Sequence, residues 1–163
     1  MWNVDLLMVG KRLMRMYETY CIPVCRRYEI NQSMLDILMF LAVHPDQNTA
    51  KDICGIRGMK KGIVSVTLEH LEQDGYLERR EDPEDRRIQR LYVTARSAKI
   101  IRDGKAQQKL FLTRTLSCLS QEERFALKTL TAKLKEQIRT MEKEMEKMQT
   151  EKEQRAGTGG QRR

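Results

Sequence analysis

Apolar residues recur every three or four positions through most of the chain, and this spacing places them on one face of an α-helix. Residues 4–27 show the pattern first, and Pro23 should bend or end that helix because proline has no backbone N–H to donate. Asn31 can cap a second helix with its side-chain oxygen, and Pro45 prevents that helix from continuing. The N-terminal part of the chain is therefore predicted to form two amphipathic helices.

Two further helical segments follow, and they are short and close together. Thr49 and Asp52 have the spacing of a capping box, with Asp in place of Glu, at the start of AKDICGI. The apolar face of the next helix is formed by Val64, Leu68 and Leu71. Gly75 is expected to end this helix in a left-handed conformation. Two helices separated by a few residues around a glycine are typical of a helix-turn-helix.

The segments YLERRE and IQRLYVT come next, and they are predicted to be two strands joined by a charged tip. Leu91 and Val93 share one face of the second strand, whereas Arg90 and Tyr92 share the other. A helix-turn-helix followed by a two-stranded ribbon is the order of elements in a winged helix-turn-helix.

Helical spacing returns after the ribbon. Thr94 can cap a long helix that begins at Ala95, because its hydroxyl can accept a bond from an early backbone N–H. Ser120 and Glu123 form a second capping box, which should open the final helix of the chain.

Charge adds an expectation about partners. The chain has 163 residues, enough for one domain or for one domain with an appendage, and a formal net charge of +8. A basic balance favours an anionic partner, most often nucleic acid and less often a membrane surface. No signal peptide and no membrane-spanning run is visible, so we expect a cytoplasmic protein without a membrane partner. Its four cysteines are then expected to be reduced.

Four stretches of the sequence together carry a family resemblance. They are LEHLEQDGYLERRED, DPEDRR, RLYVTARSAKI and LSQEERFALKTLTAKL. In this order, and with the helices between them, they resemble the MarR family of bacterial transcription regulators over most of residues 4–140. The glycine turn joined to the wing motif is the specific part of the match, because each helix taken alone is not specific to the family.

The resemblance implies an organisation for the chain. Residues 1–30 and 95–150 would form a helical dimerisation region, residues 31–94 the winged helix-turn-helix DNA-binding domain, and residues 151–163 a flexible polar tail. The expected fold class is mainly α (α+β), a winged helix-turn-helix with N- and C-terminal dimerisation helices. A two-fold homodimer presents two recognition helices and so favours a palindromic operator.

The function that the resemblance implies is a regulator that binds double-stranded DNA in a sequence-specific way. We expect a repressor that is released by a small-molecule effector. Such an effector must bind one spacing of the two recognition helices better than the other.

The recognition helix would read bases from its exposed N-terminal face in the major groove. The exposed candidates are Lys60, Lys61, Ser65 and Val66. The lysines can neutralise phosphates or bond guanine, Ser65 can bond a base or a phosphate, and Val66 can touch a thymine methyl. The alternative is that these are solvated helix residues, but the wing motif beside them favours DNA contact. Gly62 stands where the family commonly has a serine, so the operator cannot be transferred from relatives.

The wing tip carries four candidate residues, Asp85, Arg86, Arg87 and Arg90. Arg87 matches the family arginine that enters the minor groove, where narrow A·T-rich segments concentrate negative potential. Asp85 is expected to pair with an arginine and fix its direction, whereas Arg86 and Arg90 are expected to contact phosphates. The alternative is a solvated hairpin tip whose charges cancel. An exposed ion pair contributes only about 0–1 kcal/mol to the stability of the fold. The pairing is therefore better explained as a means of directing the arginine side chain.

Two other groups of residues leave alternatives open. Cys21 and Cys25 lie one helical turn apart and could form a redox switch, but peroxide-sensing relatives place their cysteine nearer the start of the first helix. Cysteines are commonly small buried hydrophobes, which is the preferred interpretation. Tyr17 and Tyr20 could line a pocket for an aromatic effector, or could pack in the core or the dimer interface.

Catalysis has little support in the sequence. No nucleophile–base arrangement, phosphate loop or carboxylate pair is visible, so we expect no enzyme activity. His44 and His70 are the two histidines, and no cluster of metal ligands is apparent, so we expect no metal and no cofactor. The remaining rival function is a winged-helix module whose basic face binds an acidic protein.

Overall fold

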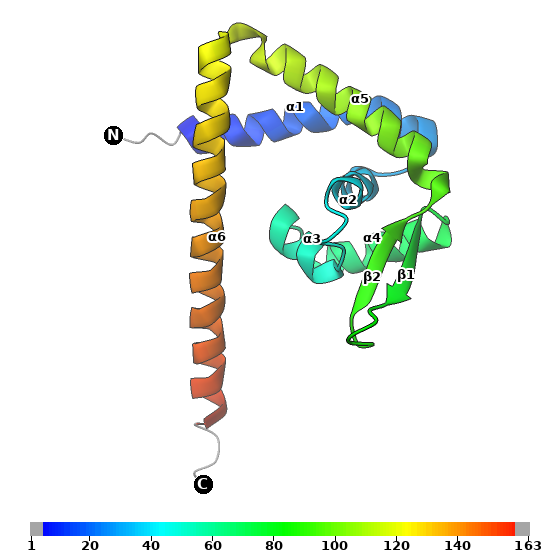
Figure 1. The fold of residues 1–163 in the computed structure, drawn as a ribbon, viewed down its shortest axis with the longest axis vertical. Coiled ribbons are helices and arrows are strands. Elements are labelled where there is room, and N and C mark those ends of the chain that lie inside the picture. Colours follow the sequence, from blue (N-terminus) through cyan, green and yellow to red (C-terminus); the bar gives the residue numbers. More distant parts are fainter. Residues whose placement is uncertain (1–4, 159–163) are drawn as a thin grey trace. The chain divides into compact units, whose positions relative to one another are not determined.

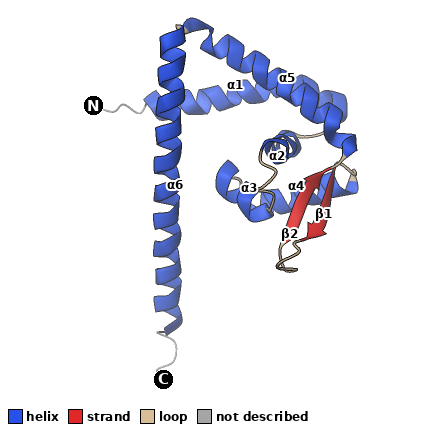
Figure 2. Cartoon of the chain, in the orientation of Figure 1, coloured by secondary structure: helices blue, strands red, loops and turns tan. Residues whose placement is uncertain are grey.

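The computed structural model describes the backbone of residues 5–158, and the side chains of residues 5–148 except residue 146. The elements are α1 (Asp5–Tyr28), α2 (Gln32–Val43), α3 (Ala50–Arg57), α4 (Lys61–Gln73), β1 (Leu77–Glu81), β2 (Gln89–Val93), α5 (Ala98–Thr115) and α6 (Gln121–Thr158). The two strands pair antiparallel, with Leu77 opposite Val93 and Glu81 opposite Gln89. Helices dominate the described part of the chain, and the ribbon of β1 and β2 follows α4 (Figure 2). The predicted mainly α winged helix-turn-helix is therefore confirmed.

The chain divides into two compact units after Arg114. The first unit holds α1 to α4, both strands and nearly all of α5, and the second holds α6. Every candidate DNA-binding residue lies in the first unit.

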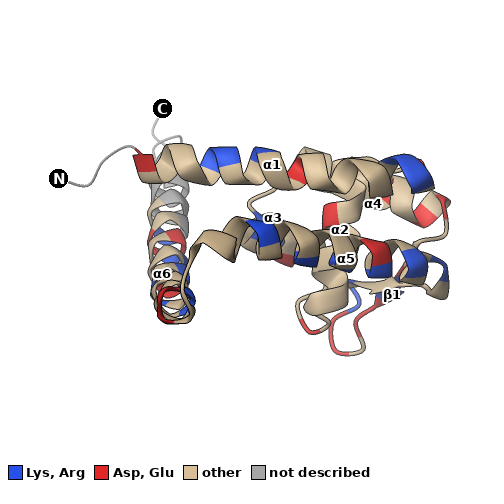
Figure 3. Cartoon of the chain, turned by 90° about the horizontal axis from the view of Figure 1, so that it is seen from above, with Lys and Arg blue, Asp and Glu red and all other residues tan. Residues whose placement is uncertain are grey.

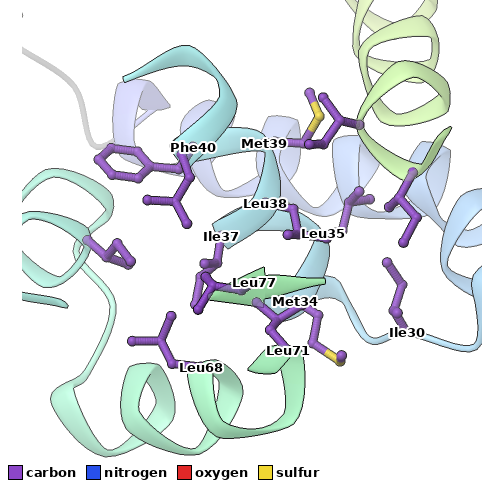
Figure 4. Packing of buried hydrophobic residues seen from close by; sticks show 14 of the residues in the cluster. Ile30, Met34, Leu35, Ile37, Leu38, Met39, Phe40, Leu68, Leu71 and Leu77 are labelled. Atoms are coloured by element: carbon purple, nitrogen blue, oxygen red, sulfur yellow. The ribbon is translucent and has the colours of Figure 1, made fainter. Parts of the chain in front are cut away.

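Helix α2 is the centre of the first unit. It is apolar on nearly every side, and a helix of that kind is stable only when it is surrounded by protein. Its buried residues are Met34, Leu35, Ile37, Leu38, Met39, Phe40 and Leu41. Figure 1 shows α2 between α1 and α5 on one side and α3, α4 and the strands on the other. Figure 4 shows Leu68 and Leu71 of α4 and Leu77 of β1 close to this helix.

The local signals in the sequence are confirmed where they concern helix ends. The Asn31 side chain accepts a hydrogen bond from the Met34 N–H at 2.9 Å. Thr49 and Asp52 form both bonds of a capping box. Gly75 has φ +72°, the left-handed conformation that glycine adopts at little cost.

The second capping box is also present, at the start of α6. The Ser120 N–H donates to Glu123 Oε2 at 2.8 Å, and the Glu123 N–H donates to Ser120 Oγ at 3.2 Å.

At Pro23 the sequence predicts a bend or an end of the helix, and the structure shows no end there. Helix α1 continues through Pro23 to Tyr28. Cys21 and Val24, on either side of the proline, are buried and hold the helix on the core. Pro23 itself is exposed, so the Thr19 carbonyl that it leaves unpaired can be hydrated. The expected break is therefore absent, because packing of the flanking residues outweighs the lost hydrogen bond.

Thr94 and the C-terminal helix also differ from expectation. The Thr94 hydroxyl donates to the Gly75 carbonyl at 2.7 Å instead of capping a helix, and a 3₁₀ turn at Ala95–Ser97 precedes α5. Helix α6 extends to Thr158, so residues 151–158 of the expected polar tail are helical, and residues 159–163 lie outside the described part. Glu, Lys, Gln and Arg dominate this stretch and are good helix formers, which explains the extension.

The contact between α5 and α2 depends on Gly104. A Cβ atom at Gly104 would lie 2.8 Å from Met39 Sδ and 3.1 Å from Leu35 Cδ1. Both distances are shorter than an ordinary van der Waals contact, so a larger residue here would force the Met39 and Leu35 side chains out of their packed positions.

We expect Gly104→Val to lower the free energy of unfolding by about 1–3 kcal/mol, which is typical of an overpacked core. Gly62→Val is the matched control, because nothing lies within 4 Å of a Cβ built at Gly62. The control should be neutral or slightly stabilising, since valine favours helix more than glycine does. Urea denaturation at one protein concentration measures both, and equal losses at the two positions would refute the close contact.

Candidate nucleic-acid interface

Helix α4 presents its apolar face to the core and its N-terminal turns to solvent. Val64, Leu68 and Leu71 are almost completely buried, as the sequence pattern predicted. The predicted contact residues Lys60, Lys61, Ser65 and Val66 are all exposed. Ile63, which was not among the predicted contact residues, is exposed on the same turns.

The start of α4 is suited to an anionic ligand. Lys60 occupies the N-cap, and a lysine side chain has no acceptor with which to cap the first backbone N–H groups. These N–H groups have no acceptor within the helix, and together with the helix dipole they favour negative charge. Lys60 and Lys61 add two positive side chains at the same place.

The C-terminal half of α4 has the opposite character. Glu69 is exposed, and the Glu72 carboxylate accepts from Arg79 Nε of β1 at 2.9 Å. Acidic side chains repel phosphates, so the groups of α4 that suit DNA are confined to its first two turns.

A second ion pair holds the helix before α4 in place. Arg57 Nη2 at the end of α3 lies 2.9 Å from Asp36 Oδ2 of α2. Gly58 follows with φ +65°, and this left-handed residue turns the chain toward α4.

At the wing tip, Asp85 holds Arg87. Arg87 Nε donates to Asp85 Oδ1 at 3.1 Å and Arg87 Nη2 donates to Asp85 Oδ2 at 3.3 Å, a two-pronged pair. The Arg87 backbone N–H also donates to Asp85 Oδ1, at 3.0 Å. The Arg87 side chain is 91% exposed, and Arg86 beside it is exposed as well. The carboxylate thus orients a guanidinium that otherwise faces solvent, as the spacing of the two residues predicted.

Asp82 organises the turn that leads into this tip. Its Oδ1 accepts from the backbone N–H groups of Glu84 and Asp85, at 2.8 and 3.1 Å, and its Oδ2 accepts from Arg90 Nε at 2.6 Å. The bond from Arg90, reinforced by the two backbone N–H groups, holds the pKa of Asp82 below its usual range.

Arg90 is half-buried and is held by two side-chain partners. Besides its bond to Asp82, its Nη1 donates to Asn48 Oδ1 at 3.1 Å. Asn48 is buried in the α2–α3 loop, and its backbone carbonyl accepts from the Leu91 N–H at 2.8 Å. We call Asn48, Asp82 and Arg90 the wing anchor, because together they tie the wing to the helix-turn-helix. Arg90 belongs to this network and keeps a partly exposed side chain, so its predicted contact with a phosphate stays a prediction.

The aromatic and thiol groups of α1 are packed against neighbouring helices. The rings of Tyr17 and Tyr20 lie 5.6 and 5.3 Å from the ring of Phe111 of α5. Burial, with a smaller contribution from Cys21, raises the pKa of Tyr17. Burial also raises the pKa of the Cys21 and Cys25 thiols, which disfavours the thiolate that oxidation requires.

A cavity of about 260 Å³ lies between α1 and α5. Its lining residues are Pro23, Val24, Arg27, Asp103, Ala106 and Gln107. Tyr17 and Tyr20, the predicted effector-pocket residues, are therefore not part of this cavity.

Asp103 forms the polar wall of the cavity. It accepts from the Tyr28 hydroxyl at 2.8 Å and from Arg27 at 3.1 Å. The hydrogen bond from Tyr28 is the main reason why the pKa of Asp103 is lowered.

Two further properties concern the described residues only. Within residues 5–148, no three His, Cys, Asp or Glu side chains are placed to hold a metal ion together. None of the helices in the described part of the chain has the length and apolar character needed to cross a membrane.

A helix-turn-helix of α3 and α4 followed by the hairpin of β1 and β2 defines a winged helix-turn-helix protein. The sequence model of the MarR family matches residues 30–88. The HTH-type transcriptional regulator YdgJ of Bacillus subtilis (strain 168), itself uncharacterized, is 30% identical over 113 residues, which are 69% of this chain and 68% of that protein. The chain therefore belongs to the MarR family. Proteins of this family are transcription regulators that bind DNA, not enzymes.

Solved structures show the same fold. The S. aureus MepR–DNA complex is similar with a TM-score of 0.66 at 19% identity, over 85% of this chain and 96% of that one. Bordetella bronchiseptica BpsR, whose DNA binding is regulated by 6-hydroxynicotinic acid, is similar with a TM-score of 0.64 at 16% identity, over 80% and 98% of the two chains.

The lowered pKa of Asp82 leads to a pH prediction. A carboxylate whose pKa is lower in the folded chain stabilises the fold fully above its unfolded pKa, and this contribution is lost as the pH falls through the folded pKa. Asp82→Asn should therefore reduce the free energy of unfolding at neutral pH. The deficit should shrink as the pH falls below the usual aspartate range.

Urea denaturation across that pH range measures the effect. Asp46→Asn, an exposed carboxylate of the α2–α3 loop, is the control and should change little at any pH. Matching pH profiles for the two variants would contradict the role of Asp82 in the wing anchor.

Proposed function

We propose that this protein is a cytoplasmic repressor that binds a palindromic operator as a homodimer and is released by a small-molecule ligand. One observation supports the DNA-binding part of this proposal. The exposed Arg87 is held in one direction by Asp85, and it belongs to the same unit as the basic start of α4. Arg87 would enter the minor groove, while Lys60, Lys61, Ser65 and Val66 would meet the major groove.

The geometry of the wing supports a contact role for Arg87. An ion pair whose arginine is almost fully exposed contributes little to stability, so the Asp85–Arg87 pair has little structural value of its own. It does restrict the guanidinium to one direction before DNA arrives, which reduces the entropy lost on binding. Arg86, also exposed, would contact the neighbouring phosphate.

The homodimer is supported by apolar side chains that the chain leaves in solvent. In α1 these are Leu6, Leu7, Met8, Val9, Leu13, Met14, Met16 and Ile22, and in α6 they are Phe125, Leu127, Leu130, Leu134, Ile138, Met141, Met145 and Met148. Figure 3 shows charged positions of both signs interspersed along the same two helices. Soluble monomers rarely expose stripes of this extent, so a second copy of the chain would cover them. Its two-fold symmetry is the reason to expect a palindromic operator.

Release by a small molecule is supported by the similarity to BpsR, whose DNA binding 6-hydroxynicotinic acid regulates. A ligand of this protein would have to favour a spacing of the two α4 helices that does not match the operator. The raised thiol pKa values make a small-molecule mechanism preferable to a redox switch at Cys21 and Cys25.

The rival function, an acidic protein partner for the basic face, makes a different prediction about DNA. The proposed function predicts a preference for one duplex over its scrambled sequence, together with a steep dependence of affinity on salt. Selection of duplexes from a random pool tests the first part, and absence of any enriched sequence would favour the protein partner.

We expect Arg87→Ala to weaken operator binding by about tenfold, because a charged contact at one point of each half-site is lost. The dimer should remain intact by sedimentation. Lys105→Ala, which removes one exposed positive charge from α5 on the other side of α2, is the control and should leave the affinity within about twofold. Wild-type affinity of the Arg87→Ala protein in a gel-shift titration would rule out the wing contact.

Lys61→Ala should weaken binding to specific and nonspecific duplexes by a similar factor, because a phosphate contact carries no sequence information. The slope of log affinity against log salt concentration should fall by about one for each phosphate contact removed. Fluorescence anisotropy at several salt concentrations gives this slope, and an unchanged slope would exclude Lys61 from the phosphate contacts.

A further inference from the structure

The first two turns of α4 carry apolar side chains that the core does not use. Ile63 is 48% exposed and Val66 is 53% exposed, although both lie among charged and polar neighbours. Residues three apart on a helix are neighbours on its surface, so these two side chains form one continuous strip. Gly62 lies next to Ile63, and a Cβ at Gly62 would meet open space.

We propose that the apolar strip, Ile63 and Val66, recognises thymine methyl groups in the major groove. The inference rests on the proposed DNA-binding function and names the feature of the operator that this helix selects. It identifies the ligand chemically, as a base that carries a 5-methyl group on the major-groove edge.

The polar groups of α4 leave few other means of reading bases. The Thr67 side chain is buried, and its hydroxyl donates to the Ile63 carbonyl at 2.7 Å, so it cannot face the groove. Lys60 and Lys61 lie at the helix start, where phosphates are favoured, and Glu69 is acidic. Ser65 is therefore the neutral hydrogen-bonding side chain among the exposed positions of these two turns.

Thymine also fits the shape and stiffness of the strip. Isoleucine and valine are β-branched and have one strongly preferred χ1 rotamer in a helix, so little side-chain entropy is lost when they meet a methyl group. Gly62 has no side chain to hold the helix away from the base edges, which allows a close approach of its backbone. The methyl of thymine is the apolar group on the major-groove edge of the base pairs.

The surroundings of the strip favour DNA over an apolar protein partner. The exposed Lys60 and Lys61 flank the strip, and Arg87 on the wing of the same unit is exposed for a further anionic contact. A protein groove that fits the strip would have to supply acidic groups at all of these places, whereas a duplex supplies them in its two backbones.

The test removes only the methyl group. The duplex selected by the full-length protein is prepared with each thymine replaced in turn by deoxyuridine, which keeps every hydrogen-bonding group of the base. We expect one or two positions in each half-site at which this change weakens binding by about fourfold, the value of one buried methyl group. Positions outside the contact region should be indifferent.

Protein variants then connect the effect to the strip. For each of the Ile63→Ala and Val66→Ala proteins, one sensitive position should lose its effect. At that position the duplex with thymine and the duplex with deoxyuridine should bind with equal affinity. Ser65→Ala is the matched control on the same turns, and it should bind more weakly but keep the fourfold preference for thymine. All three changes lie at exposed positions, and circular dichroism and sedimentation check that fold and dimer are retained.

Two results would overturn the inference while leaving the proposed function standing. One is equal binding of thymine and deoxyuridine duplexes by a protein that still prefers its selected sequence over a scrambled one. The other is a preference for thymine that persists in the Ile63→Ala and Val66→Ala proteins, because the methyl groups would then act through DNA shape. Failure to enrich any duplex would instead refute the proposed function itself.

Discussion

The need to bury α2 on all sides determines how the first unit is built. Seven of its 12 residues are buried apolar side chains, and they face in nearly every direction around the helix axis. One layer cannot cover such a helix, so α1 and α5 cover one side and α4 with the strands covers the other. The recognition helix and the proposed dimerisation helix α1 are thereby packed on the same central element. A displacement of either one has to be accommodated by α2, since a close-packed core does not deform continuously.

Polar contacts add to the apolar core, because they set the positions of the parts that are proposed to contact DNA. The ion pair between Asp36 and Arg57 fixes the end of α3, and the wing anchor fixes the base of the wing against the α2–α3 loop. Arg87 is then directed from the tip by Asp85. Arg87 thus combines an exposed guanidinium with a half-buried partner that holds it.

Sequence reasoning recovered the features that depend on neighbours along the chain. Asn31, the two capping boxes and Gly75 act within three or four residues, and the Asp85–Arg87 pair spans two, so their geometry follows from local spacing. The contacts that were missed join distant segments. Arg90 bonds Asn48 from 42 residues away, and no local pattern distinguishes this arginine from one that faces a phosphate. The helix α1 also continues past Pro23, because the burial of Cys21 and Val24 outweighs a local propensity.

The hydrogen bonds of Thr94 make the wing a closed loop. Its hydroxyl donates to the Gly75 carbonyl at 2.7 Å and its backbone N–H donates to the Tyr76 carbonyl at 3.1 Å, so the chain leaves the wing beside the point where it entered. The end of α4 and the start of α5 therefore keep the same separation whatever the length of the wing tip. Insertions within residues 83–88, beyond Asp82 of the wing anchor, would alter how far the hairpin reaches while leaving the remainder of the fold in place. The two hydrogen bonds of Thr94 thus separate the wing tip, whose length can vary, from the rest of the first unit, whose packing has to be kept.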